Sequence, residues 1–154
     1  SATVRSTGPG NALLNIGTTG GTGTLNIESG GSVTVEASGT AAALLRIGRD
    51  AGSSGTLNMT SGSLTIDGTG NNASSVLDFG RDGAIGNGVI TDSTITVLND
   101  NLGTATSSVN VGRDGGTGVV TMNNSSLTVE DFLSVGRNMA PQFASTTGAT
   151  ATVR

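Results

Sequence analysis

The sequence predicts an all-β protein that forms one parallel β-solenoid of about five three-sided coils. Three observations support this prediction. A unit of about 31 residues recurs along the whole chain of 154 residues. Within each unit, short segments alternate apolar and polar residues, and none has the spacing of a helix. Glycine, with 26 residues, separates these segments at regular intervals.

The repeat is defined by a tripeptide that ends each unit. The coils are expected to end near six equivalent apolar residues: Val4, Val35, Ile66, Val97, Val129 and Val153. Each strand then pairs in parallel with the same strand of the next coil, and such crossover connections are right-handed. We therefore expect a single right-handed domain over residues 1–154. Because both ends lie in the same phase of a coil, the chain is either a slice of a longer array or a subunit that stacks end to end.

Each coil should contain three short strands. We expect the first at 14–17, 45–48, 77–80, 109–112 and 133–136, the second at 25–27, 57–59, 89–90 and 120–122, and the third at 33–35, 64–66, 95–97, 127–129 and 151–153. In the last coil, the region around Phe143 replaces the second strand. Since side chains alternate across a strand, apolar positions should form three inward rows. These rows are Leu14/Leu45/Leu77/Val109/Leu133, Ile16/Ile47/Phe79/Val111/Val135 and Val35/Ile66/Val97/Val129/Val153.

The composition excludes several classes of function. The net charge is −4, the only aromatic residues are three Phe, and no basic cluster is present, which argues against nucleic-acid binding. No run of 18 apolar residues exists, so we expect no membrane insertion by this segment. The chain lacks His and Cys, and we therefore expect neither an enzyme nor a cofactor. A solenoid polysaccharide lyase using Asp78, Asp82, Arg81 and Arg113 is the weaker alternative, because the positions equivalent to Asp78 carry no carboxylate.

A Gly-Arg-Asp motif recurs at the end of the first strand. Its charged residues are Arg49 and Asp50, Arg81 and Asp82, and Arg113 and Asp114, with Arg137-Asn138 as a variant. Aspartate suits turns, and arginine neutralises the carboxylates stacked beside it, so we favour a turn with a charge ladder. The functional interpretation is a calcium or acidic-sugar site. Calcium is the less favoured of these, because its sites need several converging carboxylates.

The third strand carries two outward hydroxyl groups in every copy. They belong to Ser1 and Thr3, Ser32 and Thr34, Ser63 and Thr65, Thr94 and Thr96, Ser126 and Thr128, and Thr150 and Thr152. Stacked coils would arrange them as two columns on a flat face. Such a face resembles the Thr-x-Thr surface of ice-binding solenoids, which gives ice or glycan binding as an alternative function. Threonine is also simply a favourable exposed strand residue.

The segments "GGTGTLNIESGGSVTV" (20–35) and "SSLTVEDFLSVGRN" (125–138) resemble the β-strand repeats of autotransporter passenger domains, which are bacterial surface proteins. The resemblance implies a secreted parallel β-helix that serves as stalk or spacer. We therefore expect an extracellular protein of the bacterial cell surface with a structural role. It would be the shaft of an adhesin or the subunit of a head-to-tail fibre, and its partners would be copies of itself or flanking coils of its own chain.

Overall fold

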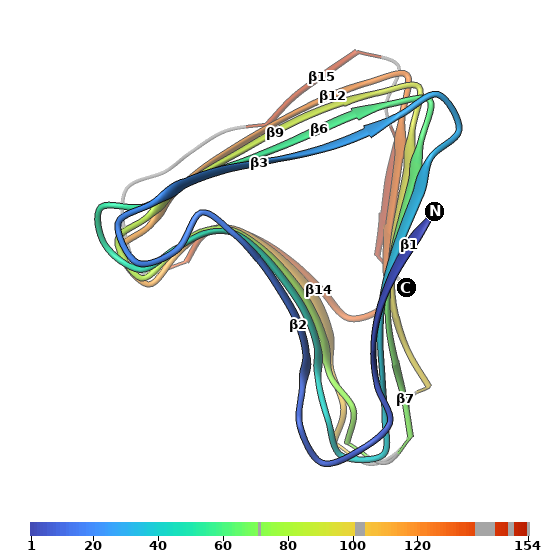
Figure 1. The fold of residues 1–154 in the computed structure, drawn as a ribbon. Helices are drawn as coiled ribbons and strands as arrows, with labels where there is room; N and C mark the ends of the chain where they lie inside the picture. The colour runs from blue at the N-terminus through green and yellow to red at the C-terminus, as the bar shows by residue number, and fades with distance from the viewer. Residues whose placement is uncertain (71, 101–103, 138–143, 148–149, 154) are drawn as a thin grey trace.

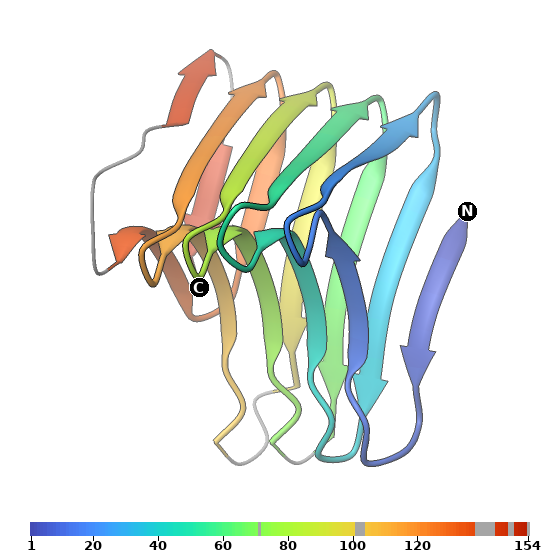
Figure 2. The same ribbon diagram turned by 60° about the vertical axis from the view of Figure 1, so that its left-hand side comes forward.

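The protein is a parallel β-solenoid with three sides, described by a computed structural model (Figure 1). The structure describes residues 1–70, 72–100, 104–137, 144–147 and 150–153. Each coil contributes one strand to each of three parallel sheets, here named A, B and C. Viewed from the N-terminal end, the chain turns clockwise as it recedes from the viewer, so the solenoid is right-handed as expected (Figures 1 and 2).

The strands follow one another in the repeating order B, C, A after β1. Sheet A contains β1 (Ala2–Ser6), β4 (Ser32–Ser38), β7 (Ser63–Thr69), β10 (Thr94–Asn99), β13 (Ser126–Val129) and β16 (Thr150–Val153). Sheet B contains β2 (Ala12–Ile16), β5 (Ala43–Arg49), β8 (Ser75–Arg81), β11 (Ser107–Arg113) and β14 (Phe132–Arg137). Sheet C contains β3 (Thr22–Glu28), β6 (Ser54–Thr60), β9 (Ile85–Thr91), β12 (Thr117–Asn123) and β15 (Ala144–Thr147).

The register of the sheets confirms the repeat. In sheet A, Val35 lies beside Ile66, and Ile66 lies beside Val97. Equivalent positions of successive units are therefore immediate neighbours in adjacent coils. The strands from β2 to β16 form five successive sets of three, in agreement with the predicted number of coils.

The predicted inward rows form the core. Leu45, Ile47, Leu77, Ile66 and Val97 are all fully buried. Sheet C adds two further rows: Leu57 and Val120 belong to one, and Ile27, Met59, Ile90 and Met122 to the other. These apolar stacks remove their side chains from water, and each such burial contributes about 1.5–3 kcal/mol.

One coil shows how the core volume is held constant along the stack. Phe79 lies between Ile47 and Val111 in its row and is larger than either of them. Across the core, Gly88 takes the position that Leu57 and Val120 have in the neighbouring coils. A Cβ at Gly88 would lie 2.8 Å from Cε1 of Phe79. The ring of Phe79 therefore fills the space that the glycine leaves.

The predicted strand boundaries were too narrow. The strands from β3 to β9 each have seven residues, because polar residues flanking the apolar pairs continue the ladders. In β9 only Ile90 of the expected 89–90 segment points into the core, whereas Val89 is exposed. Phe143 lies outside the described residues, and the second strand of the last coil is β15.

Sheets B and C meet at a corner where backbone contacts backbone. Gly48, near the end of β5, has a φ of +77°, and a Cβ at this position would lie 2.0 Å from the carbonyl oxygen of Ile85. On the facing strand, a Cβ at Gly55 would lie 2.2 Å from the nitrogen of Gly48. Only glycine permits both the left-handed conformation and this close approach. The corner therefore depends on glycine on both sides.

Substitutions of two glycines can separate two effects of a Cβ: its overlap with neighbouring main-chain atoms, and the strain of a positive φ in a residue other than glycine. Gly48 is subject to both effects. Gly52 is the matched control, because its φ is +79° and nothing lies within 4 Å of a Cβ there. We expect Gly52→Ala to lower the free energy of unfolding by about 1 kcal/mol. Gly48→Ala should lower it by at least about 4 kcal/mol or prevent folding, because backbone atoms would overlap. Urea denaturation followed by circular dichroism measures both, and equal losses would contradict the role of the corner.

Candidate functional site

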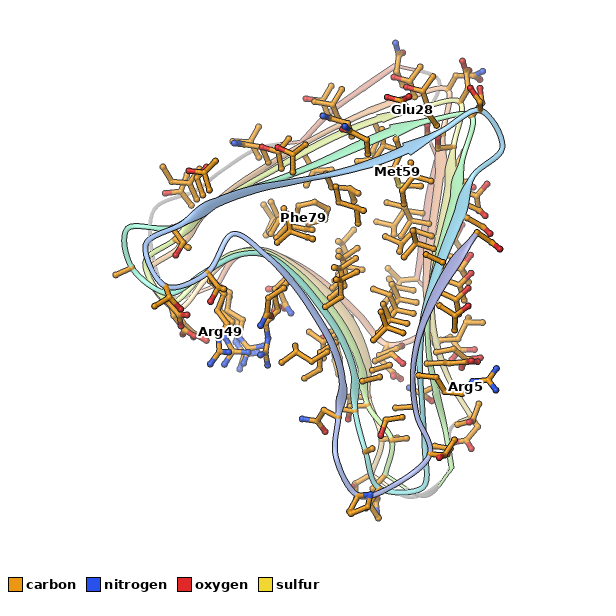
Figure 3. The ribbon with its side chains drawn as sticks, in the orientation of Figure 1. Arg5, Glu28, Arg49, Met59 and Phe79 are labelled. Carbon is orange, nitrogen blue, oxygen red and sulfur yellow. The ribbon has the colours of Figure 1, made fainter. Side chains whose placement is uncertain are left out.

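The outer face of sheet B is concave and carries most of the arginines (Figure 3). Its register aligns Asn15, Arg46, Asp78, Asn110 and Ser134 in one column. A second column aligns the four arginines of the Gly-Arg-Asp motif and its variant: Arg49, Arg81, Arg113 and Arg137. Figure 3 shows blue nitrogen atoms gathered beside the labelled Arg49 on the concave side.

The two columns face the same side because a glycine lies between them. Simple alternation would place residues three apart on opposite faces of a strand. Instead, Nη1 of Arg81 lies 3.5 Å from Oδ2 of Asp78, three residues earlier. Gly80, between them, has a φ of +71°, and this left-handed conformation reverses the alternation. The glycine that forms the corner therefore also turns the arginine column outward.

Asp78 lies at the base of this face and is fully buried. Its Oδ1 accepts a hydrogen bond of 2.7 Å from Nδ2 of Asn110. Three guanidinium groups surround it at longer distances: Arg81 at 3.5 Å, Arg113 at 3.8 Å and Arg46 at 3.9 Å. One carboxylate thus balances arginines from three successive coils. A buried charge of this kind is tolerated only because it is paired.

Each Gly-Arg-Asp turn contains its own ion pair. Nε of Arg113 donates a hydrogen bond of 2.8 Å to Asp114, and Nε of Arg81 donates one of 3.1 Å to Asp82. In the first turn, Nε of Arg49 lies 3.4 Å from Oδ1 of Asp50. The three aspartates have positive φ values between 51° and 71°, a conformation that Asp tolerates in turns. The turns therefore hold each arginine beside a carboxylate of its own coil.

Asp50 also receives a hydrogen bond from the preceding coil. The hydroxyl of Thr18 donates to Oδ2 of Asp50 at 2.8 Å. This hydrogen bond stabilises the carboxylate and lowers the pKa of Asp50.

The arginines on this face are incompletely satisfied. Four buried polar atoms here have no hydrogen-bond partner among the described residues: Oδ1 of Asn15, Nε of Arg46, Nε of Arg49 and Oδ2 of Asp78. Burial lowers the pKa of the Arg46 guanidinium, and the positive charges of Arg81 and Arg49 lower it further. Positive charge is therefore crowded around a single buried carboxylate.

A groove runs over β8, β11 and β14 on this face. Its lining combines polar residues with one aromatic ring: Ser74, Val76, Thr106, Ser108, Asn110, Arg113, Phe132, Ser134 and Arg137. We call this surface, together with Arg46, Arg49, Asp78 and Arg81 beside it, the arginine groove. Phe132 has an exposed fraction of 58%.

The predicted hydroxyl columns lie on the outer face of sheet A. Thr34 is aligned with Thr3 and Thr65, and the same register continues through Thr96 and Thr128 to Thr152. The other column aligns Ser32, Ser63, Thr94, Ser126 and Thr150. The hydroxyl of Ser126 donates a hydrogen bond of 3.3 Å to the hydroxyl of Thr94. The sequence thus located both columns.

Sheet A also stacks charges at one end of its strands. Arg5 forms an ion pair with Glu36, and Glu36 lies beside Asp67 in the next coil. Burial raises the pKa of Asp67, and the nearby carboxylates of Glu36, Glu130 and Asp100 raise it further.

Sequence reasoning found the column of Arg49, Arg81 and Arg113 but assigned no role to Arg46 or Phe132. It placed Arg46 and Asn110 at positions equivalent to Asp78 but assigned neither of them a contact with it. A usable signal was present, since a glycine precedes each motif arginine and can reverse the side-chain alternation. That Phe132 would line a groove could not be read from alternation alone.

No group of three or more acidic side chains that could hold a metal ion is found within the described ranges. Across the same part of the chain, no helix has the length and apolar character needed to cross a membrane. The chain matches no protein-family model, and neither curated proteins nor solved structures include one with significant similarity.

The role of Asp78 can be tested with a matched pair of isosteric substitutions. We expect Asp78→Asn to lower the free energy of unfolding by about 3–5 kcal/mol, because three arginines lose their shared counter-charge. Asp82→Asn should cost less than about 1 kcal/mol, since its ion pair is partly exposed to solvent. Urea denaturation at neutral pH provides both values. Similar small losses in the two variants would show that Asp78 does not hold the cluster together.

Proposed function

We propose that this chain is a structural segment of an extracellular rod that lengthens by the stacking of like coils. The observation that carries the proposal is that the core rows continue to both ends of the stack. Three parallel ladders run without change of register through all coils, which makes the rod stiff along its axis. A segment of this kind supplies length and surface.

Both ends of the stack present the same apolar positions. At the first end, Val4, Leu14, Ile16 and Leu25 are only partly buried although they pack against the core. At the other end, the inward positions Leu133, Val135 and Val153 have exposed fractions of 37%, 50% and 51%. These residues occupy the rows that are fully buried in the middle coils. Another coil of the same repeat would bury them.

The backbone at both ends is also suited to receive a further coil. In this chain β1, β2 and β3 each have one strand neighbour, as do β16, β14 and β15. Open edges of this kind pair readily with additional parallel strands. The strands β1, β2 and β3 of a following copy would continue sheets A, B and C beyond β16, β14 and β15. Such a head-to-tail contact is heterologous and generates a fibre.

Two forms of this function are compatible with these ends. The added coils belong either to a longer version of the same chain, as in the shaft of a surface adhesin, or to a second copy, as in a fibre. We place the protein outside the cell, on the bacterial surface. The likeness of its repeats to autotransporter passenger repeats supports this location, and the lack of cysteine is compatible with it.

End stacking is tested by sedimentation velocity and negative-stain electron microscopy over a range of concentrations. Head-to-tail filaments would identify a fibre subunit. Monomers whose free energy of unfolding rises when one further coil of the repeat is appended would identify a shaft segment. Monomers without such stabilisation would contradict the proposal.

Any filaments should depend on the apolar core residues that are left exposed at the two ends of the stack. We expect Leu14→Lys to abolish them, because it places a charge in the contact between copies. Leu13→Lys is the matched control, since Leu13 is an exposed residue of the same strand. Val135→Lys tests the opposite end in the same way. Circular dichroism verifies that each variant is folded, and filaments unaffected by Leu14→Lys would argue against this mode of stacking.

The aligned hydroxyl columns of sheet A favour ice binding as a second candidate function. Their in-register spacing gives a regular array of hydroxyl groups along the axis, about 4.8 Å apart. If the array binds ice, inhibition of ice recrystallisation should be lost in Thr34→Tyr and Thr96→Tyr. The same substitutions should leave filament formation unchanged. Absence of any such inhibition by the unmodified chain would remove this candidate.

A further inference from the structure

We propose that the arginine groove binds an acidic oligosaccharide, a chain of sugars carrying carboxylate or sulfate groups, along the axis of the solenoid. This surface lies on the side of the rod, away from the hydroxyl columns of sheet A, and its last strand, β14, is also the strand that would pair with a following copy. Its residues come from four coils, so a linear ligand would cross several strands of sheet B.

The distribution of charge supports an anionic ligand. The chain has seven basic residues, all arginine, and five of them lie on this one face: Arg46, Arg49, Arg81, Arg113 and Arg137. Four aspartates accompany them: Asp50, Asp78, Asp82 and Asp114. The face therefore keeps an excess of positive charge although the chain as a whole has a net charge of −4. Charge of the opposite sign is expected in its ligand.

The excess of positive charge lies at the end of the groove near β14. The first three motif arginines are each followed by aspartate, whereas Arg137 is followed by Asn138 in the sequence. Arg113 and Arg137 are aligned on neighbouring strands and both line the groove. An anionic group placed between them would be reached by two guanidinium groups, and charge-assisted hydrogen bonds of this kind are the strong ones.

The existing contacts leave donor groups available. In Arg113, Nε is used by Asp114 at 2.8 Å, while Nη1 lies 3.8 Å from Asp78, too far for a hydrogen bond. Bound anions along the column would reduce the mutual repulsion of the arginines. The lowered pKa of Arg46, caused first by burial and then by Arg81 and Arg49, is consistent with this crowding.

The remaining lining favours a sugar over other polyanions. Phe132 offers an exposed ring, and aromatic rings provide apolar surface for the face of a sugar. Beside it, Ser108, Ser134 and Asn110 offer hydroxyl and amide groups for sugar hydroxyls. A nucleic-acid strand would instead require several aromatic side chains for base stacking. The motif arginines repeat about every 4.8 Å, which allows successive charged sugars to meet successive arginines.

The proposal is tested by isothermal titration calorimetry with four probes. Oligogalacturonate carries carboxylates, a heparin-derived oligosaccharide carries sulfates, a cello-oligosaccharide is neutral, and oligo-dT is a polyanion without a sugar chain of this kind. We expect binding of at least one acidic oligosaccharide and none of the neutral one, with affinity that falls as salt concentration rises. Binding of oligogalacturonate would show that carboxylates suffice, whereas binding of the heparin-derived oligosaccharide alone would show that sulfate is required, because heparin carries carboxylates as well.

Three variants locate the binding. Arg137→Gln removes a guanidinium, and Phe132→Ala removes the ring. Each should weaken binding of the acidic oligosaccharide by about tenfold. Arg5→Gln is the matched control, because it makes the same change of charge on sheet A and should leave binding unchanged. Thermal unfolding establishes that all variants are folded.

Three outcomes would overturn the proposal. The first is that neither acidic oligosaccharide binds to the unmodified chain. The second is that Arg137→Gln and Arg5→Gln weaken binding equally, which would indicate a general effect of net charge. The third is that oligo-dT binds as tightly and responds to the same variants, which would indicate a site for polyanions of any kind.

Discussion

The close contact of two backbones at the corner between sheets B and C is the constraint on which the rest of the structure depends. A Cβ on either side would overlap main-chain atoms, as at Gly48 against Ile85. Because the strands approach so closely there, the interior is narrow and is filled in its described part by Leu, Ile, Val and Met together with the ring of Phe79. The left-handed conformation of the same glycine reverses the side-chain alternation, as the Asp78–Arg81 contact shows for Gly80. One residue type thus determines the corner, the core and the arginine column.

Stacking in register has a consequence that differs by residue type. Apolar side chains gain from lying on their equivalents, and Asn58 donates a hydrogen bond of 2.9 Å to Asn26 in the coil before it. Stacked like charges are destabilising, because adjacent strands bring them close together. The column of Arg46, Asp78 and Asn110 avoids this loss by changing residue from coil to coil. The pairing of Glu36 with Asp67 does not avoid it: burial raises the pKa of Asp67, and the charge of Glu36 raises it further.

The two proposed activities use different surfaces of the rod: its ends and its side. Growth of the rod depends on the end rows, where Leu133 and Val135 lack the neighbours that Val109 and Val111 have. Binding of an acidic oligosaccharide depends on the side of the rod, where every added coil of this type contributes another arginine. A long rod would therefore carry a long groove, and affinity for a linear ligand would increase with length because binding is multivalent. A stalk of this construction would hold a glycan while providing distance from the cell.

The sequence by itself determined the parallel solenoid, the coil boundaries, the main core rows and the hydroxyl columns. These follow from periodicity, because residues one unit apart become neighbours in an in-register stack. It did not determine the full lengths of the strands or the exposure of Val89. It also left Arg46, Asn110 and Phe132 without a role, since simple alternation does not reveal which outward residues converge. The convergence of the arginines on Asp78 depends on the left-handed glycines at the corner between sheets B and C, as the Asp78–Arg81 contact shows for Gly80. The alternation of apolar and polar residues predicts which side chains face the core. The contacts of the outward side chains depend on how closely sheets B and C approach each other, which only the tertiary structure shows.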